Sequence, residues 1–470
     1  MRSHVFGLQQ SYLPICLHRL SMLLPSESLL AYLRTSVNTA FTSCRINRRS
    51  QKCRHSHGLP PHGIRRKRVI LGMSGGVDSS VSAYMLLKEG YEVEGVYMRN
   101  WDERDENGVC PSEEDWKDVL RVCDKLGIKS HRVDFSKEYW INVFDAFLEN
   151  LAMGRTPNPD IACNREIKFG SFFDRFIRRE NSGEIKLGTT ALESVGNDQC
   201  AQSRSLEKSI KADADLIATG HYARLHHLPD GRALLLRAID KTKDQTYYLS
   251  TVPSTALQRT LFPIGAYLKS TVKRIAAEAG LHTAVKRESM GICFVGKRNF
   301  GDFIDDYLVQ PHGAFVSVDG EVKGEHRGIS RYTIGQRARI PGEVEKWYVA
   351  EKDPKRNIIY IASGRSHPAL CRRSLGVKNW HWVSGEEPVE LYSQGSIRFA
   401  VKYRYRMDPV PCMMQRSEES QGGYDITLDE PQNGLAMGQH VVAYVGDICL
   451  GGGTIERLGK WMYDKELPAI

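Results

Sequence analysis

The chain has 470 residues, of which 41% are hydrophobic and 26% charged, and its formal net charge is +9. A length of this order is typical of two or three domains, and the composition is that of an ordinary globular protein. No run of about 18 uncharged apolar residues occurs, so the sequence predicts no membrane span and no membrane partner. The eleven cysteines include no C-x-x-C pair, so neither a zinc knuckle nor a disulfide framework is indicated.

The positive charge is concentrated at the N-terminus. Residues 1–68 contain ten Arg, two Lys and a single acid, Glu27, which gives +11, and the remaining residues together carry −2. The first segment is Arg-rich, Ser-rich and acid-poor, with apolar patches, and this composition predicts a mitochondrial transit peptide over 1–66. We therefore expect the protein in the mitochondrial matrix. A disordered basic tail that binds nucleic acid is the alternative.

The segment from residue 67 to 260 is predicted to alternate between strands and helices. The predicted strands are Val69–Met73, Val93–Met98, His131–Phe135 and Asp215–Thr219, and the predicted helices are Ser79–Lys88, a helix capped by Ser112 that continues to Leu126, and Glu138–Leu151. Such alternation predicts a parallel sheet with helices on both faces, and with ligands at the carboxyl ends of its strands. Residues 181–211, rich in Gly, Ser, Asn, Gln and Lys, are expected to form a flexible surface insertion.

The remainder predicts a small central domain at 261–370 and a C-terminal β-barrel domain at 371–470. Residues 266–280 have a helical pattern that ends at a glycine, and 312–365 contain short β-like pieces. From Trp380 onward, short alternating runs are separated by turn residues, which is typical of a small barrel. The predicted fold class is therefore α/β, with an N-terminal parallel sheet followed by two smaller domains.

A glycine-rich loop, Gly72-Met73-Ser74-Gly75-Gly76-Val77-Asp78-Ser79-Ser80, joins the first strand to the first helix. Glycines let the backbone approach an anion closely, and amides at a helix N-terminus point at it. The serines add hydroxyl donors, and Asp78 suits either a bound Mg²⁺ or a helix cap. No Lys follows the glycines, so this is not the G-x-x-x-x-G-K-[ST] loop. It resembles the pyrophosphatase loop of enzymes that cleave ATP between the α and β phosphates; a glycine-rich turn without a ligand is the alternative.

Two cysteines lie in polar or glycine-bracketed loops. Cys163 follows the segment Thr156-Pro157-Asn158-Pro159-Asp160 and precedes Arg165 and Lys168 on a predicted helix. Basic neighbours and a helix N-terminus are expected to stabilise its thiolate. Cys293 is flanked by glycines, which leave its sulfur accessible. An isolated cysteine is more often a buried core residue, but these settings favour reactive roles.

From Val69 to Glu456 the chain resembles the tRNA-specific 2-thiouridylase family in its mitochondrial form. The resemblance is carried by the loop at 72–79 and by Met98-Arg99-Asn100-Trp101, Asn158–Phe169, Ala218–Tyr222, Lys243-Asp244-Gln245, Gly291–Phe294, Tyr332–Arg337 and Cys449–Gly453, in the family's order. Arg99, Ala162 and Met290 replace a usual lysine, leucine and threonine, and none of them has a chemical role in the family. The resemblance implies an N-terminal pyrophosphatase-loop domain, similar to adenine nucleotide alpha hydrolases, a central tRNA-binding domain that carries the second cysteine, and a C-terminal β-barrel.

The resemblance implies a sulfurtransferase that replaces the C2 oxygen of the wobble uridine in a subset of mitochondrial tRNAs with sulfur. ATP adenylates this oxygen, so the products are 2-thiouridine, AMP and pyrophosphate. Cys293 is implied to carry a persulfide received from a sulfur-relay protein, Cys163 to act as the nucleophilic second cysteine, and Asp160 to act as general acid or base. Turnover would then produce a Cys163–Cys293 disulfide, which needs a reductant.

The resemblance also implies which residues bind the substrates. ATP falls on Gly72, Met73, Ser74, Gly75, Gly76, Val77, Asp78, Ser79, Met98 and Gly220, with Asp78 as the candidate Mg²⁺ ligand. Contacts with tRNA fall on Asn158, Pro159, Asp160, His221, Lys243, Asp244, Gln245, Arg404, Tyr405 and Gln439. Without the resemblance, Lys402, Arg404 and Arg406 would be interpreted as ordinary solvated residues on one face of a strand. Their interleaving with tyrosines also suits phosphate pairing and base stacking.

Two other functions fit parts of the sequence. Another pyrophosphatase-loop ligase or amidotransferase, acting on a small acid with ammonia, would account for 72–79 but not for two loop cysteines and a basic β-domain. A protein that only binds tRNA would be expected to have lost the loop or one of the cysteines, and all three are intact. Pyrophosphate release that depends on tRNA would separate the first alternative from thiolation.

Overall fold

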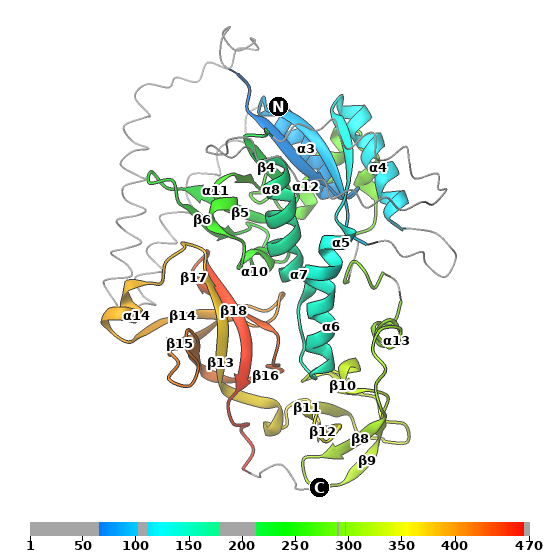
Figure 1. Cartoon of the computed structure of the whole chain (residues 1–470), viewed down its shortest axis with the longest axis vertical. Coiled ribbons are helices and arrows are strands. Elements are labelled where there is room, and N and C mark those ends of the chain that lie inside the picture. Colours follow the sequence, from blue (N-terminus) through cyan, green and yellow to red (C-terminus); the bar gives the residue numbers. More distant parts are fainter. Residues whose placement is uncertain (1–64, 102–110, 178–212, 289–290, 297, 465–470) are drawn as a thin grey trace, which may run out of the picture.

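The structure, a computed structural model, describes residues 65–101, 111–177, 213–288, 291–296 and 298–464. The predicted insertion at 181–211 lies outside these residues, as do residues 1–64 of the predicted transit peptide. Three sheets organise the described chain: a parallel sheet with helices at one end of the molecule, a small sheet at the other end, and a barrel beside them (Figure 1). Within these ranges, no helix combines the length and apolar character needed to cross a bilayer.

The N-terminal domain is built on five parallel strands in the order β3-β2-β1-β4-β7. They are β1 (Arg68–Met73), β2 (Glu92–Arg99), β3 (Lys129–Asp134), β4 (Leu216–Thr219) and β7 (Thr260–Leu261). The first four confirm the predicted strands with small differences at their ends. Because β1 pairs with β2 on one side and with β4 on the other, the strand order reverses at β1. Ligands of such sheets bind at the carboxyl ends of the strands flanking this point.

Helices cover both faces of this sheet. The helices of this part of the chain, which cover the sheet or continue away from it, are α3 (Val77–Lys88), α4 (Pro111–Leu126), α5 (Ser136–Tyr139), the π-helical η1 (Trp140–Phe144), α6 (Asp145–Ala152), α7 (Pro159–Ala162), the π-helical η2 (Cys163–Ser171), α8 (Phe172–Phe176), α10 (Thr246–Leu249), α11 (Ser254–Gln258), α12 (Lys269–Glu278) and the 3-10 turn η4 (His282–Val285). Successive strand residues face opposite sides. Val69 and Leu71 accordingly belong to one apolar core with residues of α3, α4 and α12, whereas Ile70 belongs to a second core that includes aromatic residues of α5 to α8.

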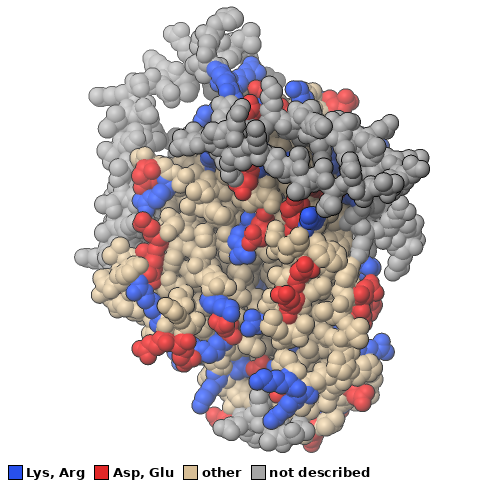
Figure 2. All heavy atoms as spheres, in the orientation of Figure 1, with Lys and Arg blue, Asp and Glu red and all other residues tan. Residues whose placement is uncertain are grey.

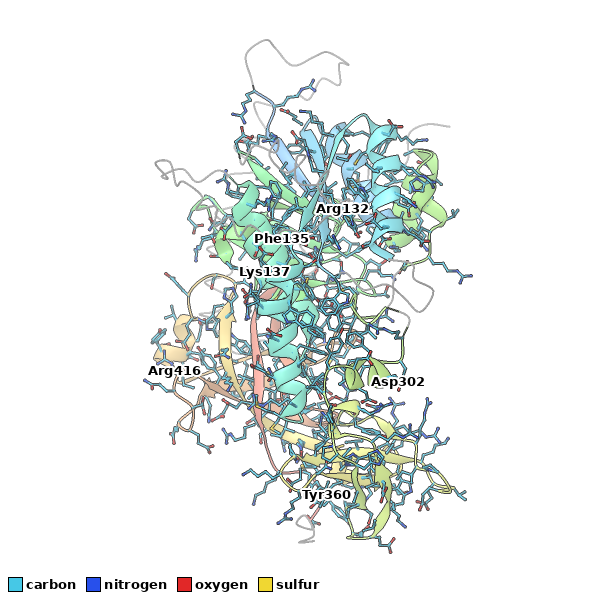
Figure 3. The ribbon with its side chains drawn as sticks, turned by 45° about the vertical axis from the view of Figure 1, so that its right-hand side comes forward. Arg132, Phe135, Lys137, Asp302, Tyr360 and Arg416 are labelled. Atoms are coloured by element: carbon cyan, nitrogen blue, oxygen red, sulfur yellow. The ribbon has the colours of Figure 1, made fainter. Side chains whose placement is uncertain are left out.

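The helices α5, η1 and α6 follow one another without a break and extend from the parallel sheet toward the small sheet (Figure 1). Figure 3 shows this unit from the side, with Phe135 where β3 passes into α5 and Tyr360 in the small sheet at the far end. This unit is the predicted helix Glu138–Leu151, extended at both ends. It therefore carries residues that follow β3 into the middle of the molecule.

Several predicted boundaries differ from the structure. Helix α4 is described from Pro111, the first residue after a gap in the description, and Ser112 lies within this span, so its predicted role as the cap stays a prediction. The predicted N-terminal domain ends at residue 260, but β7 runs to Leu261 and pairs with β4. Helix α12 also packs on the N-terminal domain, because Val272 and Ala276 belong to the same apolar core as α3. The α/β layer therefore extends well beyond residue 260.

The predicted small central domain contains a five-stranded sheet in the order β10-β11-β12-β8-β9. Its elements are α13 (Phe300–Asp305), β8 (Gly313–Ser317), β9 (Val322–His326), η5 (Ile329–Arg331), β10 (Arg337–Ala338), β11 (Trp347–Asp353), β12 (Ile358–Ser363) and η6 (Pro368–Leu370). Phe315, Val349 and Ile361 are buried at the centre of its core.

Six C-terminal strands close into the predicted β-barrel. They are β13 (Cys371–Trp382), β14 (Ser396–Lys402), β15 (Val410–Arg416), β16 (Tyr424–Asn433), β17 (His440–Val445) and β18 (Ile448–Leu458), with α14 (Val389–Ser393) between β13 and β14. The order is β13-β16-β15-β14-β17-β18, and β18 pairs with β13 to close the ring. Inward-facing residues such as Phe399, Met414 and Ile426 fill the interior.

A hairpin of the N-terminal domain joins the barrel. Strands β5 (Ala223–His227) and β6 (Ala233–Arg237) pair with each other, and β6 also pairs with β18, where Leu236 lies opposite Ile448. The first domain and the barrel therefore share one continuous sheet. Figure 2 shows that Lys and Arg are interspersed with Asp and Glu on the visible face, so basic residues form no single large patch there.

Candidate nucleotide and cysteine site

The glycine-rich loop lies at the point where the sheet order reverses. Gly75 has a φ of +71°, and a Cβ on it would lie 2.5 Å from the carbonyl oxygen of Asp115. Gly220 follows β4, and a Cβ there would lie 2.8 Å from the nitrogen of Ser79. Both positions therefore require glycine. The structure brings Gly220 against the loop, as the placement of ligands at strand ends predicts.

The loop has the properties of an anion cradle. Helix α3 begins at Val77 after Gly76, which offers no side chain to the first helical amides, so these remain available to an anion. The Ser79 hydroxyl accepts a hydrogen bond from the Ser74 amide at 3.2 Å and donates to the Gly76 carbonyl at 3.2 Å. The Ser80 hydroxyl donates to the same carbonyl at 2.8 Å. The fixed backbone and free amides fit a phosphate group.

Asp78 is held by two side chains that are remote in the sequence. The ammonium of Lys269 lies 2.8 and 2.7 Å from its two carboxylate oxygens, and the Tyr222 hydroxyl donates to it at 2.9 Å. Burial and the charge of Asp78 raise the pKa of Tyr222, which keeps the hydroxyl a donor. Asp78 does not cap α3, because Gly76 holds that position. Among the described residues, no group of three or more His, Cys, Asp or Glu is arranged to hold a metal ion.

A second lysine braces the other side of the loop. The Nζ of Lys286 lies 3.1 Å from the Gly75 carbonyl oxygen, and 2.8 and 2.5 Å from the carboxylates of Asp115 and Asp118. Although burial opposes it, hydrogen bonds to these carboxylates raise the pKa of Lys286, so it stays charged. Neither Lys269 nor Lys286 was identified from the sequence, because neither belongs to the loop motif.

Cys163 and Cys293 come together with Asp160 and Tyr139. Cys163 is buried at the start of η2, whereas Cys293 is exposed in the segment before α13. The Tyr139 hydroxyl lies 3.5 Å from the Cys293 sulfur. The two thiols and the Asp160 carboxyl are close enough to interact electrostatically. Both cysteines are free thiols in the structure, so the predicted disulfide is not formed in this state.

The prediction of a stabilised Cys163 thiolate is wrong for this state of the protein. Burial raises the pKa of the Cys163 thiol to about 12, and nearby Lys168 lowers it only in part. Desolvation by the surrounding protein also raises the pKa of Cys293, and the Tyr139 hydrogen bond opposes this. Burial raises the pKa of Asp160 as well, which moves it toward the range useful for a general acid or base.

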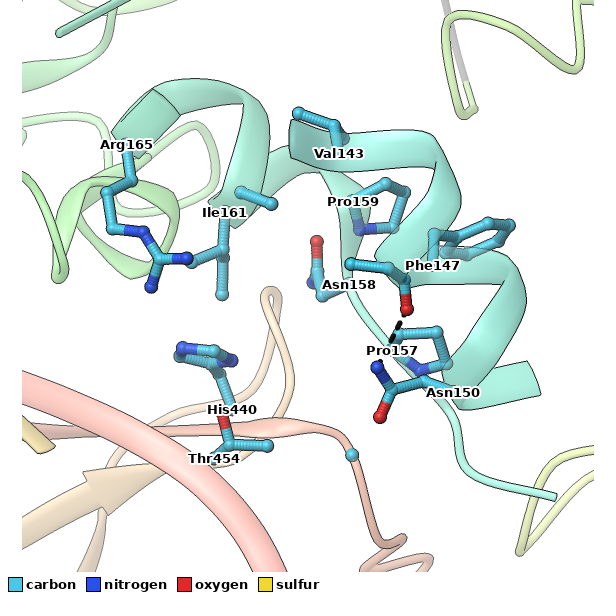
Figure 4. Close-up of a pocket in the computed structure, with 13 residues that line it drawn as sticks. Val143, Phe147, Asn150, Pro157, Asn158, Pro159, Ile161, Arg165, His440 and Thr454 are labelled. Atoms are coloured by element: carbon cyan, nitrogen blue, oxygen red, sulfur yellow. Dashed lines mark hydrogen bonds between the residues drawn. The ribbon is translucent and has the colours of Figure 1, made fainter. Parts of the chain in front are cut away.

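The predicted tRNA contacts at Asn158, Pro159 and Asp160 form the start of α7, beside the cysteines. The Asn158 side chain caps this helix by accepting a hydrogen bond from the Asp160 amide at 3.1 Å. A cavity of about 120 Å³ lies between this segment and the barrel strands β17 and β18. In Figure 4, the side chains of Arg165 and His440 face each other across it, with Asn158 beside them.

Of the predicted contacts on the barrel, Gln439 adjoins this cavity, because Gly438 and His440 on either side of it line the cavity. Arg404 follows β14 and donates to the Gly434 carbonyl at 2.9 Å, and the ring of Tyr405 lies 4.5 Å from that of Tyr248. Gln439 directly precedes His440, and its buried side-chain oxygen has no hydrogen-bond partner among the residues that the structure describes. Tyr405 therefore contacts the N-terminal domain through Tyr248, whereas the Arg404 guanidinium lies against Gly434 and beside Gly335 of the central domain.

Two other predicted tRNA contacts are engaged within the protein. His221 is buried between aromatic rings, with its Nδ1 2.7 Å from the Thr219 hydroxyl, and burial lowers the pKa of its imidazole. The Gln245 side-chain oxygen accepts from the Tyr222 amide at 2.9 Å. Lys243 is nearer the surface and pairs with Glu288 at 2.6 Å.

Asp244 is the centre of a buried charge cluster. It is 1% exposed, and it pairs with Arg237 at 3.2 Å and with Lys402 at 3.4 Å. Lys402 is itself only 2% exposed, so the interpretation of this residue as solvated is wrong. Its strand face is covered by the N-terminal domain, which supplies Asp244. The sequence motif around Asp244 therefore has a structural role in joining two domains.

An α/β sheet with a glycine-rich anion loop at its switch point is the architecture of a nucleotide-binding protein, and two free cysteines lie beside this site. Family models match as a tRNA methyl transferase HUP domain at 67–191 and 183–297, a tRNA methyl transferase PRC-barrel domain at 301–363, and an aminomethyltransferase beta-barrel domain at 372–455. Relatives named tRNA-specific 2-thiouridylase are 43% and 44% identical over 83% and 84% of its length, so the chain belongs to that family.

Curated relatives support this membership. A tRNA-specific 2-thiouridylase MnmA of Klebsiella pneumoniae is 43% identical over 398 residues, which cover 83% of this chain and 97% of the relative. The protein of the same name from Pseudomonas aeruginosa is 44% identical over 404 residues, covering 84% of this chain and 96% of the relative. Among solved structures, the U34-tRNA thiolase NcsA from Methanococcus maripaludis matches with a TM-score of 0.25 and 15% identity, covering 56% of this chain and 72% of that chain.

Proposed function

We propose that this chain is a mitochondrial tRNA 2-thiouridylase, an ATP-dependent sulfurtransferase that forms 2-thiouridine at the wobble position of a subset of mitochondrial tRNAs. One observation carries the proposal: the anion loop and the two-cysteine centre lie at the same edge of one sheet. The loop follows β1, Trp101 follows β2, and Tyr139 lies just after β3. The Trp101 ring is 5.5 Å from Phe294, which is next to Cys293. An activated substrate atom and a sulfur donor can therefore meet there.

ATP supplies the activation of the uridine C2 oxygen, which is otherwise a poor leaving group. The α3 amides and the loop would bind its phosphates. Met98 and Gly220 would contact the rest of the nucleotide. The Met98 methyl group lies 3.1 Å from where a Cβ on Gly72 would stand, so it lies beside the end of β1 that leads into the loop. Mg²⁺ bound with ATP would offset phosphate charge, and Asp78 would contact it only with an oxygen that the Lys269 ammonium now contacts.

The two cysteines have different exposures, which suits different roles. Cys293 is exposed, so it can accept a persulfide sulfur from a relay protein. The terminal sulfur attacks C2, a carbon–sulfur bond forms, and AMP leaves. Buried Cys163 either attacks the persulfide first, releasing hydrosulfide beside the base, or resolves the intermediate. Both routes leave a Cys163–Cys293 disulfide. A reductant that donates two electrons must reduce it to the two thiols before the next cycle.

Substrate tRNA would bind along the junction of the N-terminal domain and the barrel. Arg404, Tyr405 and Gln439 stand on the barrel side of this junction, and Asn158 and Asp160 on the other. His221, Asp244 and Gln245 would act there mainly by holding the neighbouring backbone, because their side chains have partners within the protein. A transit peptide over 1–66, proposed from composition alone, would direct the protein to the mitochondrial matrix.

The direct test is thiolation of an unmodified mitochondrial tRNA with ATP, Mg²⁺ and a persulfide donor, read by mass spectrometry of the digested tRNA. Cys163→Ser and Cys293→Ser should each abolish 2-thiouridine while tRNA binding stays nearly intact. Cys371→Ser is the matched control, because this free cysteine lies outside the cluster. Persistent 2-thiouridine in either active-site variant would exclude the two-cysteine scheme. Pyrophosphate release with ammonia and a small acid, without tRNA, would favour the ligase alternative.

A further inference from the structure

The glycine-rich loop has no basic residue of its own. Positions 72–80 contain neither Lys nor Arg, although a polyphosphate carries several negative charges. Lys269 lies 191 residues beyond Asp78 in the sequence, yet its ammonium contacts both Asp78 carboxylate oxygens. A cation therefore stands at the loop that the loop motif does not contain.

The Lys269 ammonium is held from several sides. Its side chain is 10% exposed, its Nζ lies 3.4 Å from the Glu288 carboxylate, and it stands 5.6 Å from the centre of the Tyr222 ring. Its backbone nitrogen donates to the Asp240 carboxylate at 2.9 Å, which fixes the start of α12. A lysine normally loses much rotamer freedom when it binds a ligand, and here folding has already removed that freedom.

The ion pair remains open at the mouth of the loop. The Asp78 side chain is 31% exposed, so a ligand in the cradle can reach it. Asp78 also has the Tyr222 hydroxyl as a second donor, and it can therefore share Lys269 with a phosphate oxygen. Lys286 is arranged differently, because its ammonium is surrounded by the Gly75 carbonyl and two carboxylates on the α4 side.

We propose that Lys269 binds the β and γ phosphates of ATP, and that Asp78 is the positioning residue that directs its ammonium into the loop. The proposal rests on the use of ATP in the proposed function, but not on the identity of the sulfur acceptor. Its rival is a purely structural ion pair that fastens α12 to α3. The two differ in one measurable property, the dependence of the affinity on the number of phosphates.

The test measures the affinity of the full chain for ATP, pyrophosphate and AMP by calorimetry, without tRNA or sulfur donor. Lys269→Met should weaken ATP and pyrophosphate at least about tenfold, the scale of a hydrogen bond to a charged group, and leave AMP within about twofold. Lys269→Arg keeps the charge and should restore most of the ATP affinity. Lys273→Met is the matched control: Lys273 lies one turn along α12 and is 46% exposed, and the carboxylate near it is Glu288, at 3.6 Å.

Wild-type ATP affinity in a folded Lys269→Met would overturn the proposal, and so would equal losses for ATP and AMP. If thermal melting shows that Lys269→Met does not fold, Lys269→Gln replaces it with the same expectations. A phosphate role would be contradicted if Lys269→Arg bound ATP no better than the neutral variant. If the variants show the predicted nucleotide affinities but the protein does not thiolate tRNA, only the proposed function is refuted. Absence of ATP binding in the wild-type chain would overturn both.

Discussion

The hydroxyl of Tyr139 lies 3.5 Å from the sulfur of Cys293, although 154 residues separate them in the chain. Tyr139 is the last residue of α5, and its ring packs edge-on against Phe294. Burial and the neighbouring thiols raise the pKa of the Tyr139 phenol, so it remains a hydrogen-bond donor at neutral pH. The cysteine proposed to carry the persulfide is thus held by a donor on the helix that follows β3.

Removing this donor should change the titration of Cys293. The Tyr139 hydrogen bond favours the thiolate, so Tyr139→Phe should raise the pKa of Cys293 further. The pH profile of Cys293 alkylation, followed by peptide mass spectrometry, should therefore shift to higher pH. Phe keeps the ring that packs on Phe294. Tyr248→Phe, a tyrosine that contacts Tyr405 instead, is the control, and an unchanged profile in Tyr139→Phe would contradict the prediction.

The two cysteines should differ in reactivity in the free protein. Cys163 is 5% exposed, and burial raises its pKa to about 12, so little thiolate exists near neutral pH. At pH 7.5 the fraction of Cys163 present as thiolate is ~3 × 10⁻⁵ for a pKa of about 12. Iodoacetamide should therefore label Cys293 well before Cys163. Equal rates at the two sites would show that the buried state of Cys163 does not persist in solution. Faster Cys163 labelling on addition of tRNA would indicate that substrate changes its surroundings.

The charge cluster around Asp244 predicts a large effect on stability. Asp244→Ala would leave Arg237 and Lys402 without their buried carboxylate, which typically destabilises a fold by about 3–5 kcal/mol. Urea unfolding followed by circular dichroism should show the loss. Asp230→Ala is the control, because this exposed residue pairs with Arg232 two positions away, and its unfolding midpoint should stay nearly unchanged. Similar midpoints for the two variants would contradict the structural role of Asp244.

Arg404 offers a test of the tRNA surface. Arg404→Ala should weaken tRNA binding, and it should reduce the slope of the logarithm of affinity against the logarithm of salt by about 1, as the loss of one phosphate contact does. Filter binding over a range of salt concentrations measures both. Arg398→Ala is the matched control on β14, since Arg398 is exposed and pairs with Asp429. A weaker affinity with an unchanged slope would mean that Arg404 acts by holding the Gly434 backbone instead.

The features that the sequence predicted well have local causes. The strands of the parallel sheet are short apolar runs, and the glycines of the loop are required at their own positions, as the φ of Gly75 shows. The barrel strands were recognisable because their inward residues alternate with outward ones. Each of these signals is contained within about ten neighbouring residues.

The features that the sequence did not predict depend on distant partners. Lys402 stands in an alternating pattern of basic residues that is typical of a solvated strand face. The segment that covers it comes from a different domain. The basic neighbours of Cys163 were visible, whereas the apolar core that encloses it was not. Lys269 and Tyr139 reach the site from α12 and α5, and nothing in their own surroundings in the sequence marks them.

The pairing of β6 with β18 has a consequence for shortened forms of the protein. A chain that stopped before residue 448 would lack the last barrel strand, and it would leave one edge of β6 without its partner. An unpaired strand edge is a template for association with other chains. A late nonsense mutation should therefore yield aggregates that are cleared by proteolysis, and not a smaller enzyme that keeps its nucleotide site.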